Sequence, residues 1–251
     1  MLKSQKLREV DPLRIGMGWT SEELKKPQII IESTYGDSHP GSAHLNTLIK
    51  EAEKAVNFFG GKAAKYFTTD ICDGQAQGHD GMNYSLASRE FIADMIEIQA
   101  MATPFDAGIF IASCDKGLPG NLIALARLNI PSIVVTGGIM AAGPNMLTLE
   151  QLGTYSAKFE RGEISKEEFS FAKENACPSC GACSFMGTAS TMQIISEALG
   201  LSLPGTALLP VTSPDLLKNS YEAGKRAVEL VKEKLFPTAI LTEEAFENAI
   251  M

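Results

Sequence analysis

The chain has 251 residues, of which 45% are hydrophobic, and it carries a formal net charge of −8. Its length is enough for one large domain, and the negative charge excludes the basic stripe that a nucleic-acid-binding surface needs. No apolar run reaches the roughly 20 residues that span a bilayer, so we expect neither a nucleic-acid nor a membrane partner. The amino terminus, MLKSQKLREVDP, lacks the apolar core of a secretory signal, and the chain has five cysteines. We therefore expect free thiols or metal ligands in a reducing cytoplasm rather than disulfides.

Strand and helix patterns alternate along the chain after a polar arm at residues 1–26. The expected strands are short apolar runs, each followed by a polar or Gly-rich loop: Pro27–Glu32, Ala64–Thr69, Ala107–Ala112 and Ile130–Thr136. The expected helices are Leu45–Phe59, Ser88–Met101, the NLIALARL segment from Asn121, Ile194–Leu199 and Ser213–Leu235, with a charged helical excursion at Thr148–Lys173. This alternation predicts one α/β domain, a doubly wound, mostly parallel sheet with helices on both faces.

The stretch Ile109–Gly120, IFIASCDKGLPG, is the first candidate site. An apolar strand stops at Cys114, Asp115 and Lys116, and a glycine-rich turn then leads into a helix. Open α/β sheets place their chemistry at this carboxyl edge, and the three residues offer a soft sulfur, a hard carboxylate and an amine. The alternative is a simple strand–helix turn with a buried free cysteine and an exposed Asp-Lys pair.

A second cysteine site is the segment CPSCGAC, which contains Cys177, Cys180 and Cys183. Thiolates at this spacing can share one metal. A structural zinc would need a fourth ligand, and the adjacent residues offer none. An iron–sulfur cluster completed by Cys114, a redox CxxC, and three small buried thiols remain as alternatives.

Hard ligands also gather in the loops that follow the predicted strands. Carboxylates suit Mg²⁺ or Mn²⁺, although an Asp before Gly is often only a turn residue. Two further histidines flank Pro40-Gly41 in the first loop, as site residues or as solvated side chains. The hard-ligand set is Asp70, Asp73, His79, Asp80 and Asp115, and the two loop histidines are His39 and His44.

Three long motifs resemble the dihydroxy-acid and 6-phosphogluconate dehydratase family, which also includes sugar-acid dehydratases. They are CDGQAQGHDGMNYSLASREFIAD, SCDKGLPGNLIALARLNIPSIVVTGGIM and CPSCGACSFMGTASTMQIISEALGLSLPG, in this order. The resemblance covers nearly the whole chain. It implies the loss of water from a 2,3-dihydroxy acid to give a 2-keto acid, with the help of an iron–sulfur cluster and Mg²⁺.

Carried over residue by residue, the resemblance implies that Cys114 and Cys183 are cluster ligands, in a 2Fe–2S or 4Fe–4S cluster. Asp73, Asp115 and a carbamylated Lys116 are implied as Mg²⁺ ligands. Many members have a third cluster cysteine where this chain has Gly41. The substitutes available in the sequence are Cys177, Cys180 and Cys72.

The chain has about half the residues of a typical family member. We therefore expect residues 1–251 to form the amino-terminal, cluster- and metal-binding domain, and a β-rich carboxyl-terminal half or partner subunit to supply the catalytic base. The expected substrate is the small dihydroxy acid of branched-chain amino-acid biosynthesis, and we expect an oligomer. The alternatives are a sugar-acid (aldonate) dehydratase and a non-catalytic iron–sulfur or zinc-binding domain.

Overall fold

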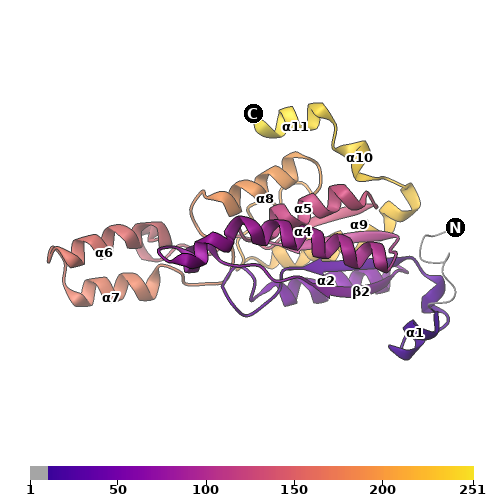
Figure 1. The fold of residues 1–251 in the computed structure, drawn as a ribbon, viewed down its shortest axis with the longest axis horizontal. Helices are drawn as coiled ribbons and strands as arrows, with labels where there is room; N and C mark the ends of the chain where they lie inside the picture. The colour runs from indigo at the N-terminus through magenta and orange to yellow at the C-terminus, as the bar shows by residue number, and fades with distance from the viewer. Residues whose placement is uncertain (1–10) are drawn as a thin grey trace.

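The computed structural model describes residues 11–251 and contains one four-stranded, fully parallel sheet in the order β2-β1-β3-β4 (Figure 1). The strands are β1 (Gln28–Ser33), β2 (Lys62–Phe67), β3 (Ala107–Ala112) and β4 (Ser132–Thr136). They confirm the four predicted strands to within a few residues. The first ten residues of the predicted arm lie outside the described residues. The remainder of the arm contains α1 (Asp11–Gly16) and the 3-10 turn η3 (Glu23–Lys25).

Helices cover both faces of the sheet, as the alternating pattern predicts. One face is covered by α2 (Leu45–Phe58) and α9 (Pro214–Glu233), and the other by α4 (Ser85–Ala102), α5 (Gly117–Leu128) and α8 (Thr188–Ala198). Within β1, Ile29 and Ile31 pack toward α2 while Ile30 packs toward α4. The strand is therefore apolar at successive positions because both of its faces are buried.

The charged excursion forms a helical hairpin that projects from one end of the molecule (Figure 1). Its helices are α6 (Leu152–Glu160) and α7 (Lys166–Asn175). The hydroxyl of Ser165 accepts a hydrogen bond from the Glu168 backbone N–H and caps α7. Between the hairpin and the sheet lie the short elements α3 (Asp73–Ala76), η4 (Asp80–Tyr84), η5 (Pro144–Met146) and η6 (Leu149–Gln151).

Two short helices at the carboxyl terminus were not expected from the sequence. They are α10 (Pro237–Ile240) and α11 (Glu243–Ile250), and Ala245 and Ala249 of α11 pack against the core under α8. Among the described residues, no helix combines the length and the apolar composition needed to cross a membrane.

The strand order places a topological switch point between β1 and β3. The chain leaves β1 toward β2 on one side and reaches β3 on the other, with Ile31 opposite Ile109 and Ser33 opposite Ile111. The loops that follow these two strands therefore diverge at the carboxyl edge of the sheet. Open α/β sheets hold their ligands in the crevice that such loops leave.

Candidate functional site

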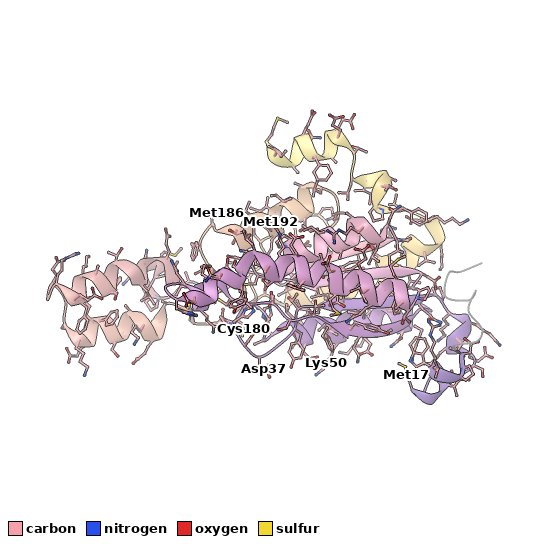
Figure 2. The ribbon with its side chains drawn as sticks, viewed as in Figure 1. Met17, Asp37, Lys50, Cys180, Met186 and Met192 are labelled. Carbon is pink, nitrogen blue, oxygen red and sulfur yellow. The ribbon has the colours of Figure 1, made fainter. Side chains whose placement is uncertain are left out.

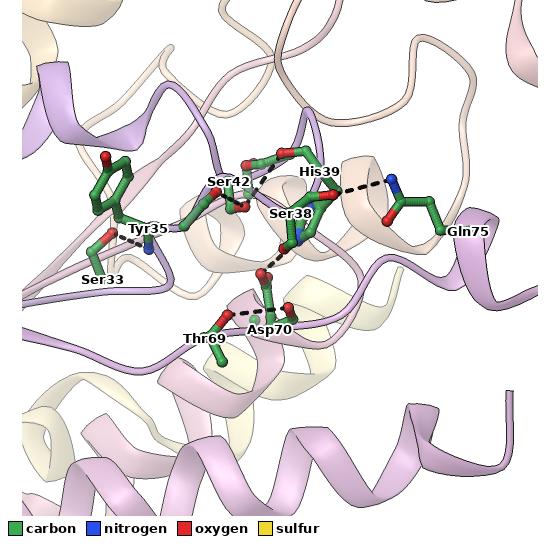
Figure 3. A network of polar contacts seen from close by, with 12 residues as sticks. Ser33, Tyr35, Ser38, His39, Ser42, Thr69, Asp70 and Gln75 are labelled. Carbon is green, nitrogen blue, oxygen red and sulfur yellow. Dashed lines mark hydrogen bonds and ion pairs between the residues drawn. The ribbon is translucent and has the colours of Figure 1, made fainter. Parts of the chain in front are cut away.

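A buried His–Asp pair joins the loops that follow β1 and β2 at this edge (Figure 3). His39 Nε2 lies 2.7 Å from Asp70 Oδ1, and the two side chains are 1% and 0% exposed. Burial lowers the pKa of His39, but the hydrogen bond and charge of Asp70, together with the charges of Cys72 and Asp115, outweigh burial, so the net pKa is raised. His39 Nδ1 and Asp70 Oδ2 are buried without hydrogen-bond partners. One histidine that the sequence left as possibly solvated is thus a fixed part of the site.

The first loop is fixed by further bonds within the same network. Ser42 Oγ donates to the Gly36 carbonyl at 2.7 Å, and Gln75 Nε2 donates to the Ser38 carbonyl at 3.1 Å (Figure 3). One bond closes the first loop on itself, and the other ties it to the loop that follows β2, so the backbone around His39 is fixed.

Asp70 also faces the first residue of α5. A Cβ built on Gly117 would overlap the Asp70 carboxylate and lie 3.0 Å from two atoms of Thr34. Only glycine leaves room for a carboxylate at this helix start. The glycine after Lys116 is therefore required by the close approach of the second loop.

Lys116 and Asp73 form an ion pair between the loops that follow β3 and β2. Lys116 Nζ donates to Asp73 Oδ2 at 2.5 Å, and Ser85 Oγ donates to Asp73 Oδ1 at 2.8 Å. Lys116 is only 8% exposed. The alternative of an exposed Asp-Lys pair at Asp115 and Lys116 is therefore wrong, because both side chains turn toward the crevice and away from solvent.

Asp115 is partly buried beside the other carboxylates. Burial raises its pKa, the charge of Lys116 lowers it, and the negative charges of Asp73 and Asp70 raise it further. The backbone N–H of Ala189, in the first turn of α8, donates a hydrogen bond to Asp115. The predicted hard ligands Asp70, Asp73 and Asp115 thus lie within electrostatic reach of one another.

Two thiols from different loops are in contact in the same crevice. The Cys114 thiol hydrogen-bonds Cys72, which lowers the pKa of Cys72 to about 6. That bond, together with burial, raises the pKa of Cys114. Burial and the nearby charge of Cys72 raise the pKa of Cys183 to about 11, and the same two causes raise the pKa of the exposed Cys177. Cys72 and Cys114 are therefore coupled thiols.

Backbone bonds fix the CPSCGAC segment against the sheet edge. The Gly181 N–H donates to the Pro40 carbonyl at 2.9 Å, and Ala182 exchanges bonds of 2.9 and 2.8 Å with Gly138 and Met140. Gly181 has φ +113°, and a Cβ there would lie 2.6 Å from the Met140 nitrogen. This approach, which only glycine permits, brings Cys183 to the loops after β1 and β4.

Gly41 marks a position from which a side chain would face Cys114. A Cβ built on Gly41 would lie 3.1 Å from Cys114 Sγ and 3.1 Å from His39 Nδ1. The position that carries a cysteine in many family members therefore points at the Cys114 thiol here.

Three of the other predicted residues are exposed or bonded to backbone groups. Asp80 and His79 are exposed, and the His79 ring contacts the Gln75 carbonyl at 2.9 Å and the Gly81 N–H at 3.0 Å, so it serves the local turn. His44 Nε2 lies 2.6 Å from the Gly137 carbonyl, and burial lowers its pKa.

One buried acid at this edge was missed at the sequence level. Glu32 is fully buried in β1, accepts bonds from the Thr68 N–H and hydroxyl at 2.9 and 2.8 Å, and has a pKa that burial raises to about 7. Its signal was a lone Glu directly after three isoleucines in a strand that is buried on both faces.

Comparison with known proteins identifies the family of this chain. The model of the family described as "Dihydroxy-acid/6-phosphogluconate dehydratase N-terminal" matches residues 26–251. The chain belongs to this family. The dihydroxy-acid dehydratases of Caldanaerobacter subterraneus subsp. tengcongensis and Moorella thermoacetica are 45% and 41% identical to it over 94% and 93% of this chain. That of Methanothermobacter thermautotrophicus is 44% identical over 93% of the chain. The chain spans 43% of the length of each of these relatives.

The family resemblance implies an iron–sulfur cluster and Mg²⁺. The donor atoms of this dehydratase-family chain are of the chemical types that these two groups bind. Thiols of Cys72, Cys114 and Cys183 suit iron, and the carboxylates of Asp73 and Asp115 suit Mg²⁺. The unpartnered buried atoms of His39 and Asp70 add polar groups that lack a partner in the crevice. Within residues 11–251, no three of the His, Cys, Asp and Glu side chains are yet arranged as a metal site. The donors are thus gathered at one edge without forming a closed ligand shell.

Proposed function

We propose that this chain is the cofactor-binding amino-terminal part of a dehydratase that converts a 2,3-dihydroxy acid into a 2-keto acid. The substrate proposed is 2,3-dihydroxyisovalerate, the dihydroxy acid of branched-chain amino-acid biosynthesis. The observation that carries the proposal is the meeting of soft thiols and hard carboxylates at one edge of the sheet, supplied by the loops after β2 and β3 and by the segment that precedes α8. The names of its relatives support the choice of substrate.

The proposed cluster ligands are Cys114, Cys183 and Cys72. Cys72 is preferred over Cys177 and Cys180 because its side chain contacts Cys114, whereas Cys177 is exposed. Cys72 would then supply the thiolate that Gly41 lacks. Three thiolates from three loops leave one direction open, which suits a cluster that must also meet a substrate.

The proposed Mg²⁺ ligands are Asp73, Asp115 and Lys116, with Lys116 carbamylated. When bound, the cluster and Mg²⁺ would supply Lewis acidity toward the departing 3-hydroxyl and the substrate carboxylate. In the structure Lys116 is a cation paired with Asp73 at 2.5 Å. Carbamylation would turn it into an anion, and two buried anions in contact repel. We therefore expect carbamylation of Lys116 and binding of a divalent cation to depend on each other.

The base that removes the C2 proton is proposed to lie outside residues 11–251. His39 is committed to Asp70 and His44 to the Gly137 carbonyl, while His79 is exposed in a turn. The Nδ1 atoms that remain on His39 and His44 are buried, and the family resemblance assigns the base to the carboxyl-terminal half. A general base contributes about 10²–10⁴-fold to rate, so the chain alone should form no keto acid at an enzymatic rate. A carboxyl-terminal half, on the same chain or on a partner subunit, would supply it.

The test joins residues 26–251 to the carboxyl-terminal part of the Caldanaerobacter dehydratase, which extends well beyond the matched region. The fusion and the isolated chain are purified without oxygen and assayed for iron, sulfide and keto-acid formation. We expect both to bind iron and sulfide, and only the fusion to turn over 2,3-dihydroxyisovalerate. Turnover of C5 or C6 aldonates instead would support the sugar-acid alternative.

Cysteine variants provide the matched comparison in the same fusion. Cys72→Ser, like Cys114→Ser, should lose most of the iron and sulfide, whereas Cys177→Ser should retain them. Stoichiometric zinc without sulfide in the wild-type fusion would contradict the dehydratase proposal and support a zinc-binding domain.

A further inference from the structure

A separate cavity lies at the opposite end of the sheet from the candidate site. It has a volume of about 270 Å³ and lies between α1, strand β2 and the segment that joins α4 to β3. Met17, which lines it, is at the α1 end of the molecule, far from Cys180 near the hairpin end (Figure 2). Its lining differs from that of the crevice, so the cavity is not an extension of the dehydratase site.

The cavity contains one cationic side chain that lacks an anionic partner. Arg14 lines it and is only 6% exposed, and its Nη1 is buried without a hydrogen-bond partner. Within residues 11–251, Arg14 makes no ion pair. Arginine is rarely buried unless it is paired, because an uncompensated charge is costly to remove from water. Arg14 is therefore a buried cation without the anionic partner that normally offsets the cost of burial.

An aromatic ring holds the arginine in this orientation. The guanidinium carbon of Arg14 lies 5.5 Å from the centre of the Trp19 ring. An aromatic ring attracts a guanidinium electrostatically but accepts little from its N–H donors, which lie in the guanidinium plane. The donors are therefore left for a planar acceptor such as a carboxylate.

The nearby charges do not supply that acceptor. Lys62 Nζ lies 5.1 Å from the centre of the same Trp19 ring, and Glu23 is bonded to Lys62 at 2.7 Å. Glu23 thus already has a cationic partner. The remaining walls are mainly apolar and include Ala64, Phe105 and Met17.

We propose that this cavity binds a small carboxylate with an apolar body. The carboxylate would accept hydrogen bonds from Arg14, and the body would lie against Phe105 and Ala64. At about 30 Å³ per heavy atom the volume has room for roughly nine non-hydrogen atoms, which suits a short branched or aromatic acid. The proposal does not rest on the dehydratase function, because it uses none of the residues in the crevice.

The test is calorimetric or ligand-observed NMR titration of the 251-residue chain with isovalerate and with isovaleramide. The two probes have the same shape and differ in charge. We expect isovalerate to bind at least tenfold more tightly than the amide, a factor that corresponds to about 1.4 kcal/mol. Equal affinity for acid and amide, or no binding of isovalerate up to about 10 mM, would overturn the proposal.

Two variants test separately whether binding depends on the charge of Arg14 and on the volume of the cavity. Arg14→Met should weaken isovalerate binding at least tenfold, and Ala64→Leu should weaken it by filling the cavity. Arg127→Met is the matched control, because Arg127 is paired with Asp94 on the exposed surface, and it should leave the affinity unchanged. Unchanged affinity in a folded Arg14→Met would refute the site. If that variant does not fold, the acid–amide comparison on the wild-type chain still decides.

Discussion

Replacing Asp70 with Asn should change how the stability of this chain depends on pH. The pKa of His39 in the folded chain is raised above the ordinary 6.5, through the bond to Asp70. A histidine whose folded pKa is raised contributes stability that is fully present below its unfolded pKa. That contribution is lost as the pH rises through the folded value. The cost of Asp70→Asn should therefore be larger at pH 6 than at pH 9.

The structure sets the size of the effect. His39 Nε2 and Asp70 Oδ1 are 2.7 Å apart, and both side chains are almost completely buried. Removing one member of a buried ion pair costs about 3–5 kcal/mol, and a hydrogen bond to a charged group contributes about 1.5–3 kcal/mol. Asn keeps the shape and one oxygen acceptor, so we expect a loss of about 2–3 kcal/mol at pH 6. As the pH rises through the folded pKa the histidine loses its charge, and the loss should fall toward about 1 kcal/mol.

The assay is urea unfolding of the chelator-treated chain at pH 6 and pH 9. Asp70→Asn, His39→Gln and the double variant form a mutant cycle that isolates the coupling between the two side chains. His44→Gln is the control of opposite sign. Burial lowers the pKa of His44, so its effect on stability should grow as the pH rises. A His39–Asp70 coupling below about 0.5 kcal/mol at pH 6, or one that does not vary with pH, would refute the reasoning.

Three further predictions concern the same edge of the sheet. Gly117→Ala should destabilise the chain by about 1–3 kcal/mol in urea or thermal unfolding, because the new Cβ would overlap Asp70. Gly153→Ala, in α6 with open space around it, should be neutral or stabilising by up to about 1 kcal/mol, and equal effects would contradict the packing argument. Cys72, whose pKa is about 6, should be alkylated by iodoacetamide at pH 7 much faster than Cys183, whose pKa is about 11, as mapped by mass spectrometry. Its labelling should slow below pH 6, and faster labelling of Cys183 would be inconsistent with the Cys72–Cys114 bond. Asp73→Asn should weaken Mg²⁺ binding at least tenfold by calorimetry, whereas Asp80→Asn, in an exposed turn, should not, and equal affinities would remove Asp73 from the metal site.

The sequence by itself determined the sheet and the position of the central motif. Apolar runs buried on both faces are visible without a structure, and so is their alternation with helical spacing. Because parallel strands end at one edge, the placement of Cys114, Asp115 and Lys116 at that edge followed directly. The resemblance in three motifs added the family, which the match over residues 26–251 confirmed.

The local sequence pattern predicted helix boundaries least well where tertiary packing stabilises the helix. The sequence placed the start of α8 at Ile194, whereas the helix begins at Thr188. Residues 188–191, TAST, include β-branched and hydroxyl side chains with low helix propensity. Contacts with the core and the Asp115–Ala189 bond outweigh that preference.

Only the tertiary structure decided which donors meet. Cys72, Cys177 and Cys180 were equivalent substitutes in the sequence, and the structure pairs Cys72 with Cys114 through a hydrogen bond. His39 lay in a polar loop and gave no sign that it is buried against Asp70. These contacts join loops from neighbouring strands, whose separation in space depends on the strand order β2-β1-β3-β4. Periodicity and spacing describe one segment at a time, so a contact between two loops is fixed only when the sheet brings their strands together.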